Sequence, residues 1–159
     1  MISPRLQQEL TQELNGLKIC LAEIDKNTHF LQNTTDVNYQ KLLAKAIALD
    51  IHGFYSEVER IFEQITKQID RNPPAKSEQW HKNLLQQMSV AIPQVRDAVI
   101  NPSNLANLDE LRRFRHVVRS HYAYKLDINK ILDLAIKVPH CYELLERDLE
   151  QFELSTSPD

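Results

Sequence analysis

The chain has 159 residues, of which 42% are hydrophobic and 26% are charged, and its formal net charge is −3 at pH 7. A chain of this length and composition is typical of one folded domain with its own core, which argues against a disordered protein. It contains two glycines, Gly16 and Gly53, which excludes glycine-rich phosphate loops and argues against doubly wound α/β folds and β-sandwiches.

The first predicted helix begins at Ser3 and Pro4, a capping residue followed by a proline in the first turn. Leucines and an isoleucine recur along it at spacings of three and four, and it is expected to end near Asn27. A polar connector over residues 28–35 precedes a second, longer helix, which is expected to end near Asp70, before two prolines.

The rest of the chain predicts three further helices, over residues 76–91, from residue 103 or 108 to 122, and from 128 to 152. Residues 94–100 lie between two prolines and are expected to form a short helix or a packed loop. Pro139 is expected to kink or break the last helix, and residues 154–159 to form a disordered tail. The sequence therefore predicts an all-α fold, an antiparallel bundle of about five helices in one domain over residues 1–153.

The apolar segments and the cysteines predict the cellular compartment. No apolar run reaches the roughly 18 residues that a membrane span needs, and the N-terminal residues lack the apolar stretch of a signal peptide. Cys20 and Cys141 form no metal-binding or disulfide pattern, so we expect reduced thiols in the core. These features predict a cytoplasmic protein that has no membrane contact and uses no cofactor.

The positive charge is concentrated in one segment. Residues 111–125 carry five cations, two histidines and no acidic residue, which leaves the rest of the chain strongly acidic. On a helix, Arg115, Arg119 and Tyr122 share one face, and Arg112 and His116 form a neighbouring row. Guanidinium groups bind phosphate oxygens, and imidazole can give or take a proton at neutral pH. This combination suits cleavage of RNA phosphodiester bonds without a metal ion.

Two other interpretations of these residue types remain open. Basic helix faces commonly pair with acidic neighbours, and Glu57, Glu59 and Glu63 on the second helix are candidates for such pairing. Glu78 and His81 match half of the ligand set of a di-iron helical bundle, which predicts a metal-binding enzyme. A second Glu-x-x-His pair is absent from the sequence.

Residues 114–119, followed by a His-Tyr pair and then Leu-Asp, resemble the motif helix of the HEPN superfamily, and more narrowly that of HepT-like ribonuclease toxins. The superfamily is marked by an arginine, four to six residues and a histidine. Arg115 and His121 are the only pair in the chain with this spacing. Residues 52–62 and 80–88 resemble the second and third helices of a HepT-like subgroup, so the resemblance spans roughly residues 40–135.

The resemblance implies a dimeric helical bundle that acts as a metal-independent endoribonuclease toxin. It also implies a partner, an antitoxin of the minimal nucleotidyltransferase (MNT) type. In the catalytic site it implies, Arg115 holds and polarises the RNA phosphate, and His121 is the general acid or base. His116 and Arg119 assist them.

The remaining charged and aromatic residues of the segment have implied roles too. Arg112, Arg113 and Lys125 would attract the RNA strand electrostatically. In such systems the antitoxin transfers AMP to a tyrosine of the motif, which adds negative charge where the RNA phosphate binds. Tyr122 and Tyr124 are the candidate acceptors, and Tyr122 fits the usual spacing better.

The chain departs from the commonest HepT spacing at one position. That spacing places Ser120 where the histidine is expected, so His121 comes one residue late. On a continuous helix Arg115 and His121 point about 120° apart. Either the helix loosens there, or the two side chains come from different protomers, or His116 is the working imidazole. The alternative function is a catalytically inactive helical bundle that binds a nucleotidyltransferase partner.

Overall fold

The structure is a computed structural model that describes residues 2–120 and 127–156. Within these residues it contains five α-helices and one π-helical segment, which are α1 (Pro4–Gln32), α2 (Val37–Ile65), η1 (Thr66–Asp70), α3 (Trp80–Met88), α4 (Pro102–Ser120) and α5 (Ile128–Thr156). No strand is present in the described part of the chain. The predicted all-α fold with five helices is confirmed.

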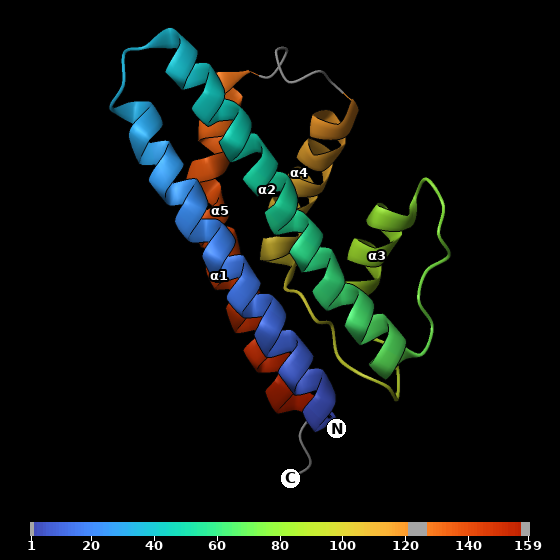
Figure 1. The fold of residues 1–159 in the computed structure, drawn as a ribbon. Coiled ribbons are helices and arrows are strands. Elements are labelled where there is room, and N and C mark those ends of the chain that lie inside the picture. The colour runs from blue at the N-terminus through green and yellow to red at the C-terminus, as the bar shows by residue number, and fades with distance from the viewer. Residues whose placement is uncertain (1, 121–126, 157–159) are drawn as a thin grey trace.

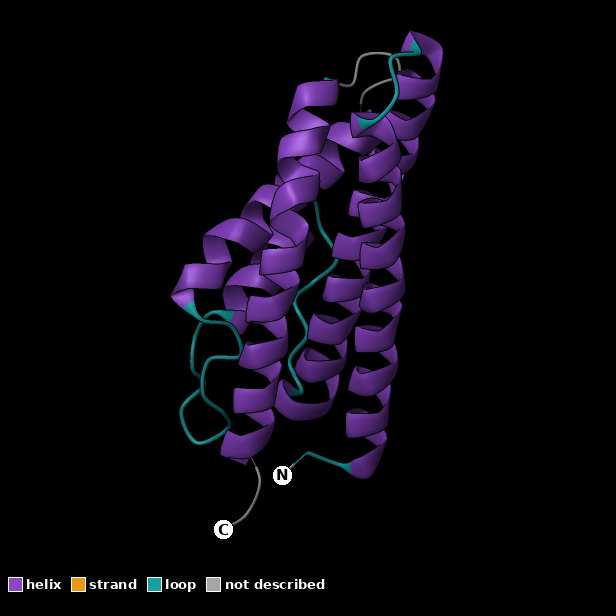
Figure 2. Ribbon diagram, turned by 90° about the vertical axis from the view of Figure 1, so that its left-hand side faces the viewer, coloured by secondary structure: helices purple, strands orange, loops and turns teal. Residues whose placement is uncertain are grey.

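The three longest helices form one side of the molecule. In Figure 1, α1 and α2 form an antiparallel hairpin, and α5 lies behind them with its C-terminal end beside the start of α1. The helix α4 runs antiparallel to α2 and α5, and the short α3 packs against α2 and α4. Figure 2 shows the same bundle from the side, with the long helices nearly parallel to one axis.

Side-chain caps explain where the first two helices begin. Ser3 Oγ accepts the backbone N–H of Leu6 at 3.1 Å, as the predicted cap requires. Asp36 Oδ1 accepts two amide groups of the first turn of α2, at 2.9 and 3.1 Å. Between these caps α1 continues past its predicted end near Asn27 to Gln32, because its apolar stripe extends to a buried leucine in the last turn.

A buried ion pair fixes the far end of α2. The helix passes into η1, which ends at Asp70 as predicted, and Arg71 then takes a left-handed conformation with φ of 53°. The Asp70 carboxylate accepts two hydrogen bonds from Arg96, at 2.5 and 2.8 Å, and both side chains are 0% exposed. Arg96 also donates to three backbone carbonyls. Its guanidinium therefore ties the loop before α4 to the end of the α2–η1 helix.

Residues 94–100 form a packed loop, the second of the two predicted possibilities. Val99 and Ile100 are buried, and their amide groups donate to the carbonyl oxygen of Met88 at 2.9 and 3.2 Å. After this loop, Asn101 Oδ1 accepts the amide of Ser103 at 2.9 Å and caps α4. The loop thus sets the position at which α4 begins.

The last helix is longer than predicted. It continues through Pro139, so of the predicted kink or break the break does not occur, and the proline is on the exposed side of the helix. It also includes residues 154–156, which the sequence predicted to belong to a disordered tail, whereas residues 157–159 lie outside the described part. Buried Leu149 and Phe152 hold the final turns against the core.

The core is formed by the inward stripes of all five helices, and its largest fully buried side chains are Tyr55, Phe54, Phe62 and Phe152. Among the described helices, none has both the length and the apolar character needed to cross a membrane.

Candidate functional site

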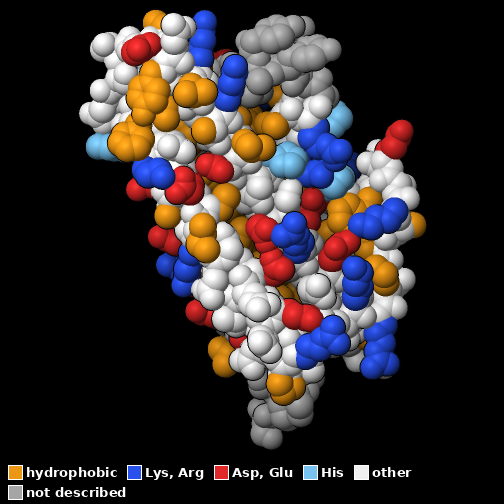
Figure 3. Space-filling view, viewed as in Figure 1, with side chains coloured by type: hydrophobic (Ala, Val, Ile, Leu, Met, Phe, Trp, Pro, Cys, Tyr) orange, Lys and Arg blue, Asp and Glu red, His pale blue; other side chains and the backbone are white. Residues whose placement is uncertain are grey.

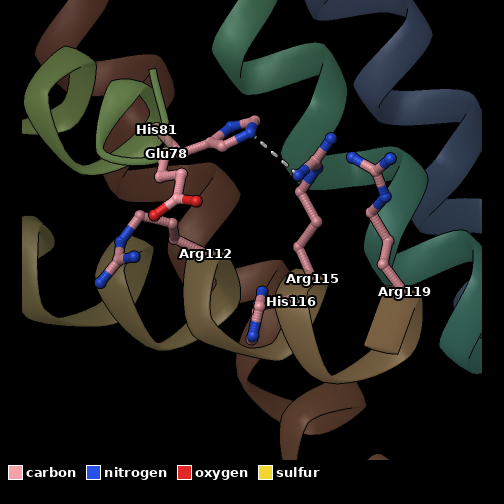
Figure 4. A pocket seen from close by; sticks show the side chains of 6 residues that line it. All are labelled: Glu78, His81, Arg112, Arg115, His116 and Arg119. Atoms are coloured by element: carbon pink, nitrogen blue, oxygen red, sulfur yellow. Dashed lines mark hydrogen bonds between the residues drawn. The ribbon is translucent and has the colours of Figure 1, made fainter. Parts of the chain in front are cut away.

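A pocket of about 340 Å³ opens between the start of α3 and the second half of α4. It is lined by three arginines, two histidines and one glutamate, which are Arg112, Arg115, Arg119, His81, His116 and Glu78. Figure 4 shows that Arg115 and Arg119 extend from α4 toward α2, while His81 comes from α3. In Figure 3, basic and histidine side chains gather over the same part of the surface. Three guanidinium groups around one cavity favour an anionic ligand.

The helical period of α4 places these side chains. Leu111 and Phe114 are buried and Val118 packs against the core, so the opposite face of the helix turns outward. The two predicted rows, Arg115 with Arg119 and Arg112 with His116, consequently border one pocket.

Arg113 lies away from the pocket. Its side chain is 66% exposed and its Nε lies 3.3 Å from an oxygen of Asp109. The same carboxylate also contacts Arg112 at 2.8 Å. One acidic residue of α4 therefore orients two neighbouring arginines, and only Arg112 turns into the pocket.

Arg115 is held by residues from two other helices. Its Nη1 donates to His81 Nε2 at 3.2 Å, and its Nε lies 3.7 Å from Oε1 of Glu59. The other oxygen of Glu59 accepts a hydrogen bond from His81 Nδ1 at 2.5 Å. The three side chains therefore contact one another pairwise, and they join α2, α3 and α4.

The electrostatics of this group follow from burial. Glu59 is 5% exposed, and loss of hydration raises the pKa of its carboxyl group, although the hydrogen bond from His81 and the charge of Arg115 act in the opposite direction. Burial also lowers the pKa of His52, and the positive charges of Arg115 and Arg119 lower it further. His52 therefore favours its neutral form beside these cations.

Unsatisfied polar atoms concentrate around Arg115. Within the described residues, the buried side-chain atoms without a hydrogen-bond partner are Arg115 Nε, His52 Nε2, Tyr55 Oη and Thr28 Oγ1. The first three belong to groups that interact electrostatically with Arg115 or are part of it. Because buried polar groups are usually paired, the polar groups around Arg115 are less completely satisfied than those elsewhere in the described core.

The predicted pairing of the basic face with three glutamates is correct for one of them. Glu59 reaches Arg115. Glu57 instead pairs with Arg60 at 2.6 Å, and Glu63 pairs with Lys76 at 2.8 Å. Two of the three glutamates are therefore paired with lysine or arginine residues that do not line the pocket.

Four of the predicted site residues, His121, Tyr122, Tyr124 and Lys125, lie outside the described residues.

The position of His81 between Glu59 and Arg115 was not predicted from the sequence. For His81 the sequence offered an alternative role as a metal ligand together with Glu78, but the described residues contain no group of three or more His, Cys, Asp or Glu side chains that could hold a metal ion. One signal was present: Glu59 lies within the apolar stripe of the second helix, three residues before Phe62 and four after Tyr55. A glutamate in a buried stripe predicts a specific partner.

Both cysteines are free, as expected of reduced thiols. Cys141 is buried and Cys20 is partly buried. Burial raises the pKa of Cys141 to about 12 and that of Cys20 to about 11, so neither thiol is activated as a nucleophile.

The comparison with known protein families identifies a matching family. A family model described as "HepT-like protein" matches residues 46–156, a range that contains Glu59, His81 and Arg115 and leaves out α1. Neither the search of curated proteins nor the search of solved structures found a match.

Proposed function

The chain belongs to the HepT-like protein family, and on this premise we propose that it is a metal-independent endoribonuclease, the toxin of a HEPN/MNT-type toxin–antitoxin pair. The observation that carries the proposal is the pocket in which Arg112, Arg115 and Arg119 converge beside imidazole groups. This is an arrangement that can bind an RNA phosphate and move protons around it.

In the proposed reaction, Arg115 binds the scissile phosphate and stabilises the charge that grows on its oxygens. Arg119 assists it, and His116 and His121 are the candidate groups for proton transfer. Arg112, Arg113 and Lys125 attract the strand, so their contribution should weaken as salt concentration rises.

The proposal includes partners and a location. The protein works in the cytoplasm with an MNT-type nucleotidyltransferase antitoxin, which transfers AMP to Tyr122 or Tyr124. It forms a homodimer, and exposed apolar side chains on α2 support this part. Leu42 and Leu49 are 63% and 65% exposed, and they share one helix face because they are seven residues apart.

One observation favours a second function, an inactive helical bundle that binds a nucleotidyltransferase. The Arg115 side chain is only 16% exposed and already pairs with Glu59. An arginine in this position can hold three helices together without any substrate.

The test is cleavage of RNA by the purified protein in EDTA, after intact mass has confirmed that no tyrosine carries AMP. Arg115→Ala, His116→Ala and His121→Ala are compared with the wild type. Arg5→Ala is the matched control, because Arg5 lies at the start of α1 and its side chain is 84% exposed.

Cleavage that persists in EDTA, is abolished by Arg115→Ala and is unchanged by Arg5→Ala supports the nuclease. The two histidine variants identify which imidazole of the motif takes part. If the unmodified wild type cleaves none of several RNAs, the binding protein is the better conclusion.

A further inference from the structure

The contacts of His81 with Glu59 and Arg115 determine which nitrogen of its imidazole ring carries the proton. Arg115 Nη1 can only donate, so His81 Nε2 must accept at 3.2 Å through its lone pair. In the neutral ring the proton is then on Nδ1, which donates to Glu59 Oε2 at 2.5 Å. Glu59 therefore selects the tautomer of His81 that leaves a basic nitrogen facing Arg115.

His81 is also held firmly in this orientation. The Trp80 ring meets it edge-on, with the ring centroids 4.8 Å apart and an interplanar angle of 81°. Trp80 is itself 8% exposed, and Lys76 Nζ lies 3.4 Å from its ring centre. The imidazole is thus fixed on two sides and still lines the pocket, since its side chain remains 30% exposed.

We propose that His81 is the general base of the RNA cleavage proposed above, on which this inference rests, and that Glu59 is its positioning residue. A buried carboxylate behind an imidazole fixes the ring and stabilises the cation that forms when the ring takes a proton. His81 lies outside the Arg–His motif, so the site has a base that does not depend on where the late His121 points.

The proposed reaction is an internal transesterification at the scissile phosphate. His81 Nε2 takes the proton of the ribose 2′-hydroxyl while O2′ forms a bond to phosphorus. The bond from phosphorus to O5′ breaks, and O5′ leaves with a proton from a second acid or from water. The products are a 2′,3′-cyclic phosphate and a 5′-hydroxyl end. Arg115 binds the phosphate oxygens and no longer donates to Nε2, which frees the lone pair for the 2′-hydroxyl proton.

Charged groups from each element packed around His81 affect this step. The helix α2 contributes Glu59, and the segment before α3 contributes Glu78. The pocket face of α4 contributes Arg112, Arg115, His116 and Arg119. Glu59 is the group that accepts the hydrogen bond from Nδ1 of the ring. Replacing Glu59 with glutamine should therefore disfavour the imidazolium and move the acidic limb of the kcat/KM profile to lower pH.

The experiment measures kcat and KM in EDTA on an RNA with one ribonucleotide in a DNA strand. We expect His81→Ala to lower kcat by about 10² to 10⁴-fold with little change in KM. Added imidazole should restore part of this activity. Glu59→Gln should lower kcat less and shift the acidic limb. His140→Ala is the matched control, because His140 is an exposed histidine on α5.

A second substrate tests whether His81 acts as the general base or as the general acid. With sulfur in place of O5′, the leaving group needs no proton, so a variant that lacks the general acid recovers its rate. His81→Ala should stay slow on this substrate. Recovery of His81→Ala would assign it as the acid and overturn the proposal.

The outcomes separate this inference from the proposed function. One outcome is that the wild type cleaves RNA, Arg115→Ala does not, and His81→Ala keeps its kcat. The proposed nuclease activity is then supported, but the general base is a residue other than His81. If the wild type does not cleave, both proposals fail. Circular dichroism and thermal melts of each variant must match the wild type, and His81→Gln is the second variant if alanine disturbs the fold.

Discussion

Among the described residues, two arginine–carboxylate pairs join α2 or its π-helical extension η1 to another segment of the chain, and they differ in how completely their hydrogen bonds are satisfied. Arg96 and Asp70 are fully buried and joined by two hydrogen bonds, and Arg96 donates to three backbone carbonyls as well. Arg115 and Glu59 lie 3.7 Å apart, Arg115 Nε has no hydrogen-bond partner among the described residues, and the guanidinium lines a pocket.

This difference separates a structural arginine from one that is available to a ligand. A guanidinium whose donors are all used can bind nothing further without losing stability. A guanidinium that lines a cavity can donate to an anion bound there. The residue types are the same in both pairs, so burial and completeness of hydrogen bonding distinguish their roles.

The largest effect on stability is expected for Arg96→Ala. It leaves the Asp70 carboxylate buried without its cation, which costs about 3–5 kcal/mol. At this chain length we expect a fall in Tm of roughly 10 °C, measured by thermal unfolding. A change in Tm of only a degree or two would show that the loop before α4 does not need this pair.

Arg115→Ala should have the opposite profile, with a large loss of activity and a small loss of stability. We expect RNA cleavage to fall by about 10²- to 10³-fold, as when one donor to a developing oxyanion is removed. Stability should fall by only about 1–2 kcal/mol, because Glu59 keeps its hydrogen bond to His81. Initial rates and Tm measured on the same preparation check both parts. A loss of Tm equal to that of Arg96→Ala would make Arg115 a structural residue too.

Glu59 predicts a pH dependence of stability. Its pKa is raised in the folded protein because burial disfavours the carboxylate. A carboxyl group with a raised folded-state pKa stabilises the protein most below its unfolded-state pKa, and this contribution is lost as pH rises through the folded-state pKa. The wild type should therefore lose Tm relative to Glu59→Gln as pH rises from about 4. A constant difference between the two melting curves would contradict this.

The smallest effect is expected at Gly53, which lies on α2 near Glu59 and provides a baseline for that helix. A Cβ atom added there meets nothing within 4 Å. Gly53→Ala should raise stability by about 1 kcal/mol through helix propensity alone. RNA cleavage should be unchanged. A destabilised variant would show that the backbone at this position needs the freedom of glycine.

The sequence predicted the helices well because their signals are local. Ser3 and Asp36 cap their helices through bonds to nearby amides, and apolar residues at spacings of three and four must share a face. The predicted ends of two helices fell short of the observed ones. Packing against the core carries α1 to Gln32 and α5 to Thr156, and tertiary contacts outweigh the local preferences there.

Half of the site was also determined by the sequence. The period of α4 requires Arg112, Arg115, His116 and Arg119 to lie near one face, whatever the helix packs against.

The tertiary structure alone decided which groups meet that face. Glu59 and His81 are 22 residues apart and lie on different helices, so no local pattern joins them. Their contact with Arg115 depends on how α2 and α3 pack against α4, and on the loop that Arg96 holds in place. The helical period determines which side chains of one helix share a face. The packing of the core determines which side chains from three different helices come together in one site.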